Sequence, residues 1–169
     1  LSVSQLNKLY SSGWDVSSHT VNHHHLTRLS TNILNIELNE SKLWLDNAGF
    51  TRSSQFLAYP YNDYDIRVIE ILRSNGYLAA RTGNLNVGSY SQYNLSNPKA
   101  FEMATLLVDG YGDNETSPSY IKNEINNTIM SNGLLIITFH HIIDTIPSVH
   151  EDYTIADFKI VSDFLKNEE

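Results

Sequence analysis

The sequence has 169 residues, a length that suits one domain with one hydrophobic core, so we expect a single domain over residues 1–169. Its formal net charge is −8 and its 11 Lys and Arg residues are scattered, which argues against nucleic acids and anionic membranes as partners, because phosphate binding requires clustered cations. The chain contains no cysteine, which excludes disulfides and thiolate chemistry, and no apolar run long enough to span a membrane.

Helices and strands are predicted to alternate along the chain. Helices, indicated by apolar residues at helical spacing, are expected at residues 4–10, 30–48, 63–75, 119–132 and 157–166. Strands, indicated by short apolar and β-branched runs, are expected at residues 14–18, 56–59, 77–81, 101–108 and 134–139. This alternation indicates βαβ units and an α/β fold with a parallel sheet, either open or closed into a barrel. The stretches 82–99 and 108–118, rich in Gly, Asn and Ser, are predicted to be surface loops.

Chemically distinctive residues follow four of the predicted strands. They are His19, the tripeptide Tyr59-Pro60-Tyr61, Arg81 and His140. In parallel sheets and barrels the active site forms where strands pass into the loops that follow them. We therefore expect these residues to lie at equivalent edges of one sheet.

Two histidines are separated by four positions, a spacing that lets both imidazoles face one ion, for which zinc is the natural candidate. These are His19 and His23. A zinc protease would carry a glutamate directly after the first histidine, but Thr20 stands there, which excludes that class. The alternative is that His23, His24 and His25 form a solvated polar loop, and the spacing alone does not decide between the two interpretations.

Three segments resemble the motifs of the NodB-type polysaccharide deacetylases. They are residues 13–27 around His-Thr-x-x-His, residues 56–62 around Tyr-Pro-Tyr, and residues 134–142, a buried strand that ends in Phe-His-His. The resemblance implies that His19 and His23 bind a divalent metal, zinc or else cobalt or manganese, and that the threonine between them steadies the loop by hydrogen bonding. It implies the fold of an incomplete or distorted (β/α) barrel with about five parallel strands.

The same resemblance assigns roles to the other candidates. Tyr59, Pro60 and Tyr61 would form one wall of a substrate groove, where the backbone N–H of Tyr61 would help bind the oxyanion of the tetrahedral intermediate. His140 would be the general acid that protonates the leaving amine. His141 points to the opposite side if the strand continues, so we expect it to be structural or to support the site from outside.

The sequence departs from the family pattern in two places. The family's arginine, two positions before the motif proline, is Ala58 here, and Arg81 stands where its partner aspartate is expected. We hypothesise that Arg81 supplies the positive charge from the other strand. The family's Thr-Phe-Asp-Asp-Gly segment, which would supply the general base and the third metal ligand, has no counterpart, and the sequence contains no Asp-Asp pair. We therefore expect the chain to lack the family's first strand and helix, as a fragment would, to bind metal weakly and to show impaired activity by itself.

These observations predict metal-dependent hydrolysis of N-acetyl groups, or O-acetyl groups, on a polysaccharide or an N-acetylated oligosaccharide. Two alternatives remain open, a non-catalytic carbohydrate-binding module and a hydrolase of a non-sugar amide. An unpaired sheet edge would favour a homodimer formed by strand pairing or swapping. Sequons favour an extracellular or cell-surface location, and they begin at Asn39, Asn94, Asn114 and Asn126.

Overall fold

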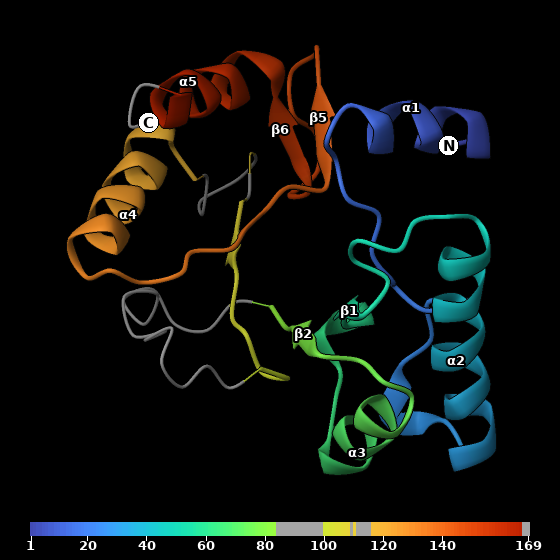
Figure 1. The fold of residues 1–169 in the computed structure, drawn as a ribbon. Coiled ribbons are helices and arrows are strands. Elements are labelled where there is room, and N and C mark those ends of the chain that lie inside the picture. The colour runs from blue at the N-terminus through green and yellow to red at the C-terminus, as the bar shows by residue number, and fades with distance from the viewer. Residues whose placement is uncertain (84–99, 109, 111–115, 167–169) are drawn as a thin grey trace. The chain divides into compact units, whose positions relative to one another are not determined.

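Residues 1–83, 100–108, 110 and 116–166 are described by a computed structural model, drawn in Figure 1. The chain divides into two compact units, the first made of Leu1–Gly83 with Lys99–Met103 and the second of Asn84–Pro98 with Ala104–Glu169. Each unit has its own cluster of buried apolar residues. Most of the two predicted surface loops, and the sequons at Asn94 and Asn114, lie outside the described residues.

The first unit is built from helices that alternate with short strands. Its elements are α1 (Val3–Ser11), α2 (Thr31–Asn47), β1 (Phe56–Ala58), α3 (Ile66–Ser74) and β2 (Ala79–Arg81), with short 3-10 turns at Leu26–Arg28 and Pro60–Asn62. Ser2, Ser30 and Asp65 cap the three helices, each accepting a hydrogen bond from the backbone N–H three residues on. All three helices were predicted from the sequence, and their ends agree with the prediction to within a turn.

The strands of the first unit run parallel. β1 pairs with β2 in a register that places Ala58 beside Arg81. Isolated bridges extend this pairing on both sides, from Ser18 to Leu57 and from Arg81 to Met103. Four chain segments therefore lie side by side in parallel, as expected for βαβ units.

The strand predicted at residues 14–18 is reduced to the single bridge at Ser18. The guanidinium of Arg52 donates to the carbonyl of Trp14 at 2.7 Å and to the carboxylate of Asp15 at 2.6 Å. At the start of residues 14–18, hydrogen bonds from the Arg52 side chain replace the backbone pairing of a strand. The prediction was right about direction and wrong about extent.

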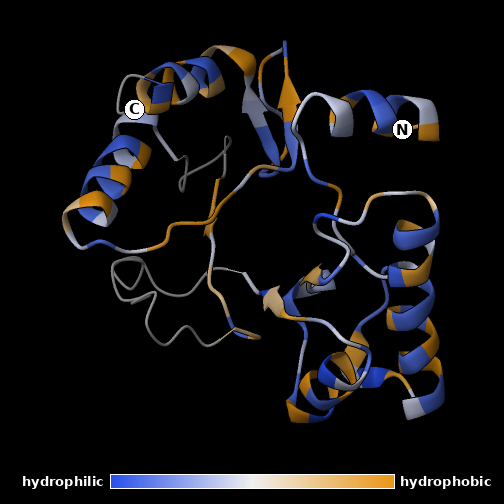
Figure 2. Cartoon of the chain, in the orientation of Figure 1, coloured by the Kyte–Doolittle hydropathy of each residue, from blue (hydrophilic) through white to orange (hydrophobic). Residues whose placement is uncertain are grey.

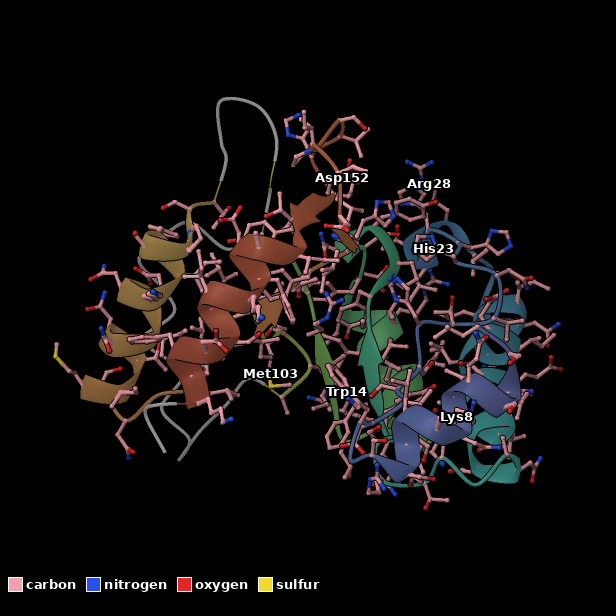
Figure 3. All side chains as sticks on the ribbon, turned by 90° about the horizontal axis from the view of Figure 1, so that it is seen from above. Lys8, Trp14, His23, Arg28, Met103 and Asp152 are labelled. Carbon is pink, nitrogen blue, oxygen red and sulfur yellow. The ribbon has the colours of Figure 1, made fainter. Side chains whose placement is uncertain are left out.

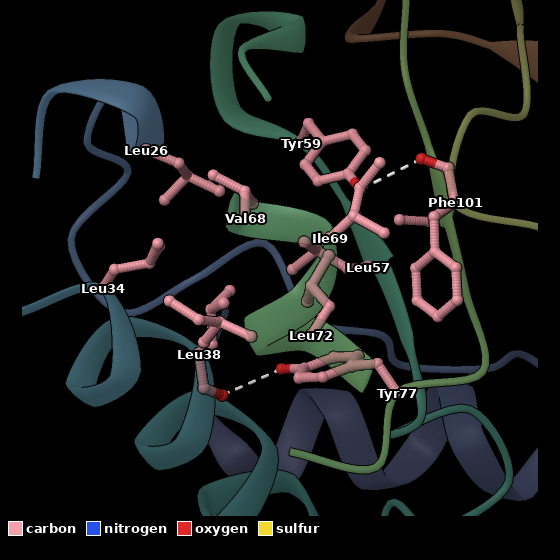
Figure 4. Packing of buried hydrophobic residues seen from close by; sticks show 12 residues of the cluster. Leu26, Leu34, Leu38, Leu57, Tyr59, Val68, Ile69, Leu72, Tyr77 and Phe101 are labelled. Atoms are coloured by element: carbon pink, nitrogen blue, oxygen red, sulfur yellow. Dashed lines mark hydrogen bonds between the residues drawn. The ribbon is translucent and has the colours of Figure 1, made fainter. Parts of the chain in front are cut away.

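The core of the first unit is formed by α2, α3 and the strands (Figure 4). Its buried aliphatic residues are Leu26, Leu34, Leu38, Leu57, Val68, Ile69, Ile71, Leu72 and Ala80. Two buried tyrosines also belong to it. Tyr77 donates to the carbonyl of Leu38 at 2.9 Å, and Tyr59 donates to the carbonyl of Phe101 at 3.0 Å. Both tyrosine hydroxyls therefore have hydrogen-bond partners although their rings are buried.

The second unit is also an α/β arrangement. Its elements are β3 (Leu106–Leu107), α4 (Pro118–Met130), β4 (Ile137–Thr138), β5 (His141–Ile143), β6 (Asp152–Thr154) and α5 (Ile155–Lys166). β3 pairs with β4 and β5 with β6, both in parallel. Its buried cluster contains Leu106, Val108, Ile121, Ile125, Tyr153 and Val161. Both helices predicted in this part of the sequence are confirmed.

The sheet itself differs from the prediction. The described strands form three separate two-stranded parallel sheets, and within the described ranges they do not close into a barrel. The apolar run 134–139 contributes only two strand residues, because apolarity indicates burial but does not supply a pairing partner. The pair β5–β6 was not predicted, since its residues mix His, Asp and Thr with Ile and give no alternating pattern.

Polar and apolar residues alternate around the helices of both units, as Figure 2 shows by hydropathy. This pattern is typical of helices that bury one face and expose the other. Among the helices that the structure describes, none combines the length and hydropathy required to cross a bilayer.

Candidate functional site

The two histidines predicted to bind metal meet at the end of the Ser18 bridge. The Nε2 atoms of His19 and His23 are 3.0 Å apart, and their ring centroids are 4.6 Å apart at an interplanar angle of 74°. Nδ1 of His19 lies 2.7 Å from the carbonyl oxygen of Ala58. Figure 3 labels His23 among the side chains of this loop. The structure thus brings together the pair that the sequence spacing singled out.

The geometry of this pair is compatible with a shared metal ion. Nδ1 of His19 faces the carbonyl of Ala58, so the proton of its neutral ring lies on Nδ1 and its Nε2 carries the lone pair that could coordinate an ion. Two imidazole nitrogens on one ion, each at about 2.0–2.1 Å, are separated by roughly 2.9–3.4 Å for angles between square and tetrahedral. The observed 3.0 Å falls in that range. No group of three or more His, Cys, Asp or Glu residues suited to an ion occurs in the described part of the chain, so the pair provides two ligands.

The loop between the histidines is fixed by side-chain hydrogen bonds. The backbone N–H of His23 donates to Oγ1 of Thr20 at 3.1 Å, which is the steadying role that the resemblance implied for this threonine. The backbone N–H of Thr20 in turn donates to Oγ of Ser18 at 3.3 Å. Thr20 and His23 both have positive φ, 68° and 56°, although neither is glycine. Such conformations persist where the surroundings hold them.

Glu37 of α2 is a site residue that the sequence analysis missed. Its carboxylate accepts hydrogen bonds from the backbone N–H groups of Val21 and Asn22, and only 2% of the residue is exposed. A signal existed in the sequence, because Glu37 lies at helical spacing between the buried residues Leu34 and Leu38. A carboxylate on the apolar stripe of a helix indicates a specific polar partner.

The tripeptide after β1 divides into a buried and an exposed part. Tyr59 is 1% exposed and stacks on Tyr64, so its ring belongs to the core and is not available for the predicted groove wall. Burial raises the pKa of Tyr59 well above its ordinary value. Pro60 is buried as well and opens the 3-10 turn. Tyr61 is 58% exposed, and its ring lies 4.6 Å from that of His23.

Tyr61 has the features expected of the predicted oxyanion donor. Its φ is 54°, and its backbone N–H donates to no acceptor within the described residues. Its ring stacks on that of His25 at 4.0 Å, and His25 lies 3.7 Å from the carboxylate of Asp63. The free N–H therefore sits on an exposed aromatic residue that is packed against the histidine loop.

Arg81 lies on the same face of the strands as His19. The bridge from Ser18 to Leu57 puts His19 level with Ala58, and Ala58 is the register partner of Arg81. Across two strand spacings, the backbones of His19 and Arg81 are about 10 Å apart, with Ala58 on the strand between them. Burial lowers the pKa of Arg81, and its guanidinium forms no ion pair with any described residue. The charge-supplying role of Arg81 stays a prediction.

A pocket of about 470 Å³ adjoins His19 on its other side. It is lined by residues 16, 17 and 19–21 of the histidine segment and by Glu40, Ser41, Trp44 and Leu45 of α2. Trp44 is 48% exposed. His19 is thus reached from a hollow with an aromatic wall.

His140 belongs to the second unit, where it lies exposed between β4 and β5. Its role as general acid therefore stays a prediction. His141, on β5, lies with Nδ1 3.2 Å from the carboxylate of Asp152 on β6. This contact across the two strands fits the structural role expected for His141.

Lowering the pH should remove the stabilisation that ionised Asp152 gives to the second unit. Its carboxylate accepts hydrogen bonds from the backbone N–H groups of Ser148 at 2.9 Å and Val149 at 3.3 Å. The bond from Ser148 is the main cause that holds the pKa of Asp152 below its ordinary value. Because the folded pKa lies below the unfolded one, this stability is present above about pH 4 and is lost as the pH falls through the folded pKa.

Urea midpoints measured between about pH 6 and about pH 2 check this prediction. Asp152→Asn should be less stable than the parent protein near pH 6, and the difference should shrink as the pH falls. Parallel pH profiles for the two proteins would contradict it.

Comparisons with known proteins bear on the family and the fold. Residues 2–80 match the family described as Polysaccharide deacetylase. A search of curated proteins finds no significant match. Several solved structures share the fold, and three of them are named as deacetylases or carbohydrate esterases.

The chain is 23% identical to the Streptococcus pyogenes deacetylase PplD in complex with acetate, with a TM-score of 0.53, and the match covers 62% of this chain and 43% of that one. It is 16% identical to a family 4 carbohydrate esterase from Streptomyces lividans in complex with acetate, with a TM-score of 0.57 and coverage of 98% and 68%. It is 16% identical to a de-N-acetylase from Aggregatibacter actinomycetemcomitans, with a TM-score of 0.53 and coverage of 73% and 53%. The chain thus spans less than two thirds of the first and third of these proteins. Residues 2–80, somewhat less than half of the chain, are thus similar to the polysaccharide deacetylase family, and the chain shares the fold of the family 4 carbohydrate esterase.

Proposed function

We propose that the protein hydrolyses N-acetyl groups, or O-acetyl groups, on a polysaccharide or an N-acetylated oligosaccharide with the help of a divalent cation. His19 and His23 would hold this cation, zinc or else cobalt or manganese. The observation that carries the proposal is the 3.0 Å separation of their Nε2 atoms, with Nδ1 of His19 fixed by the carbonyl of Ala58. The match of residues 2–80 to the polysaccharide deacetylase family supports the reaction class.

A divalent cation bound there would polarise the acetyl carbonyl and lower the pKa of a bound water. The residues of the chain supply the remaining contacts. The exposed ring of Tyr61 offers a sugar a flat apolar surface, and its backbone N–H can donate to an oxyanion. His140, which is exposed, would protonate the leaving amine.

Arg81 would supply positive charge on the substrate side of the strands. It shares a face with His19, and the small side chain of Ala58 leaves the space between them open. A half-buried guanidinium without a described counter-ion attracts anionic groups that enter this face. Arg81→Ala should therefore reduce activity, and unchanged activity would rule out this role.

Several further features belong to the same proposal. Residues 1–169 would form one domain with the architecture of a distorted or incomplete (β/α) barrel, as the partial likeness to the family 4 carbohydrate esterase suggests. Activity of this chain by itself would be impaired, since the sequence has no Asp-Asp pair and the pair of histidines has no described third ligand. We also propose an extracellular or cell-surface location and a homodimer formed through a sheet edge.

Acetate release from an N-acetylated oligosaccharide, measured with and without added zinc, tests the function. We expect release above background only in the presence of the cation, and binding of the oligosaccharide in both conditions. Binding without any release, and without zinc affinity, would favour the carbohydrate-binding module, for which the exposed aromatic residues Trp14, Trp44 and Tyr61 are suited. Release from a non-sugar acetamide alone would favour the amide hydrolase.

A further inference from the structure

We propose that Glu37 is a positioning residue for the histidine pair. Its buried carboxylate holds the backbone between Thr20 and His23, and through this backbone it sets the place of the His23 ring. The inference rests on the proposed function insofar as the pair binds a cation. The arrangement of the two rings, however, can be measured without any cation.

The carboxylate of Glu37 is used entirely by this loop. One oxygen, Oε2, accepts from the backbone N–H of Val21 at 3.0 Å and of Asn22 at 2.8 Å, and the other, Oε1, accepts from the side-chain amide of Asn22 at 2.6 Å. These bonds join α2 to Val21 and Asn22, which precede Glu37 by 16 and 15 positions in the sequence. Hydrogen bonds to an ionised carboxylate are stronger than those between neutral groups, so this is a firm attachment.

The environment of Glu37 keeps it ionised. Burial opposes the charge, but the hydrogen bonds from the side chain and backbone of Asn22 and from the backbone of Val21 outweigh it, so the pKa of Glu37 lies below its ordinary value. The ring of His24 also lies near this carboxylate, with Nε2 4.0 Å from Oε1 and with more than half of its side chain exposed. The backbone N–H groups of the loop, and not a salt bridge, are thus the main partners of the charge.

The loop needs such an attachment because of its backbone conformation. Thr20 and His23, on either side of the two anchored residues, have positive φ, which side chains other than glycine adopt rarely. Oγ1 of Thr20 secures His23 from within the loop, and Glu37 secures the two residues between them from α2. Because each residue of the turn is fixed by a hydrogen bond, Nε2 of His23 lies 3.0 Å from Nε2 of His19.

Glu37→Gln tests the proposal, with Asp46→Asn as the matched control. Glutamine keeps the shape but loses the charge, and its NH2 group would face N–H donors in place of one acceptor oxygen. Asp46 is a carboxylate on the same helix and forms an ion pair with Lys42, so Asp46→Asn makes the same change of charge away from the loop. Any general effect of charge on α2 appears in both variants.

Two measurements are made on the folded proteins. In the metal-free state, the NMR cross-peak between ring protons of His19 and His23 should be lost or strongly weakened in Glu37→Gln and kept in Asp46→Asn. Zinc affinity, from competition with a fluorescent chelator, should fall by about 10- to 100-fold in Glu37→Gln only, as is typical when a residue that orients a ligand is replaced.

A second variant, Asn22→Ala, removes an exposed side chain and one of the three bonds, so it serves where Glu37→Gln does not fold. It should weaken the same cross-peak to a smaller degree. A full-intensity cross-peak and unchanged zinc affinity in Glu37→Gln would overturn the proposal. If the parent protein binds no zinc, the proposed function fails, whereas the cross-peak in the metal-free protein still decides the role of Glu37.

Discussion

Replacing His19 with alanine should lower zinc affinity by more than about 100-fold and abolish zinc-dependent acetate release. Residues that only orient a ligand already change affinity by about 10- to 100-fold, and the loss of one of two ligands must exceed that. The alanine variant also removes the ring that is tied to the carbonyl of Ala58. Titration with zinc and the acetate assay measure the two effects.

His24→Ala is the matched control for this prediction. His24 is the direct neighbour of His23, and more than half of its side chain is exposed, so its removal should leave zinc affinity within about twofold. Loss of acetate release in His19→Ala with oligosaccharide binding intact supports the enzyme. A His19→Ala protein that still binds zinc as tightly as the parent would show that the pair is not the metal site.

Replacing Leu38 with alanine should destabilise the protein by about 3 kcal/mol, the usual cost of removing a fully buried leucine. Leu38 is 0% exposed and packs in the core between α2 and α3 (Figure 4). The backbone carbonyl that accepts from Tyr77 remains in the variant, so the loss reports packing alone. Urea unfolding, analysed for the free energy of unfolding in water, measures it.

Leu43 on the same helix provides the control. It is 47% exposed, so Leu43→Ala should change the free energy of unfolding by less than about 0.5 kcal/mol. Equal effects at the two positions would mean that α2 does not bury the face assigned to it.

The helices could be predicted from the sequence because their signals are local. Ser30 and Asp65 stand at the caps of α2 and α3, and apolar residues recur along each helix at the right spacing. The strands were harder, because pairing depends on a neighbour that is distant in sequence. The segment before Ser18 is hydrogen-bonded to Arg52, which lies more than 30 residues away in the sequence. No local sequence pattern predicts that contact.

The candidate site could be predicted in part for the same reason. Residue spacing and the family resemblance located His19 and His23, whose rings the structure brings together. Burial of Tyr59 could not be foreseen from its motif, since an exposed groove and a core position both suit a tyrosine. Glu37 could have been noticed as a charge on an apolar stripe, but its partners come from a loop that only the folded chain places beside α2.

The left-handed backbone at Thr20 and His23 has a consequence for how a cation would enter. The free-energy cost of this backbone conformation is offset when the chain folds. The two rings therefore face each other before any ion binds. Binding of an ion would order few further protein groups, so the conformational entropy lost on binding would be small. A site of this kind, with two imidazole nitrogens from the described residues as ligands, would discriminate weakly among divalent ions of similar size. Under the proposed function, the ion that it binds would then be decided largely by the supply in its surroundings.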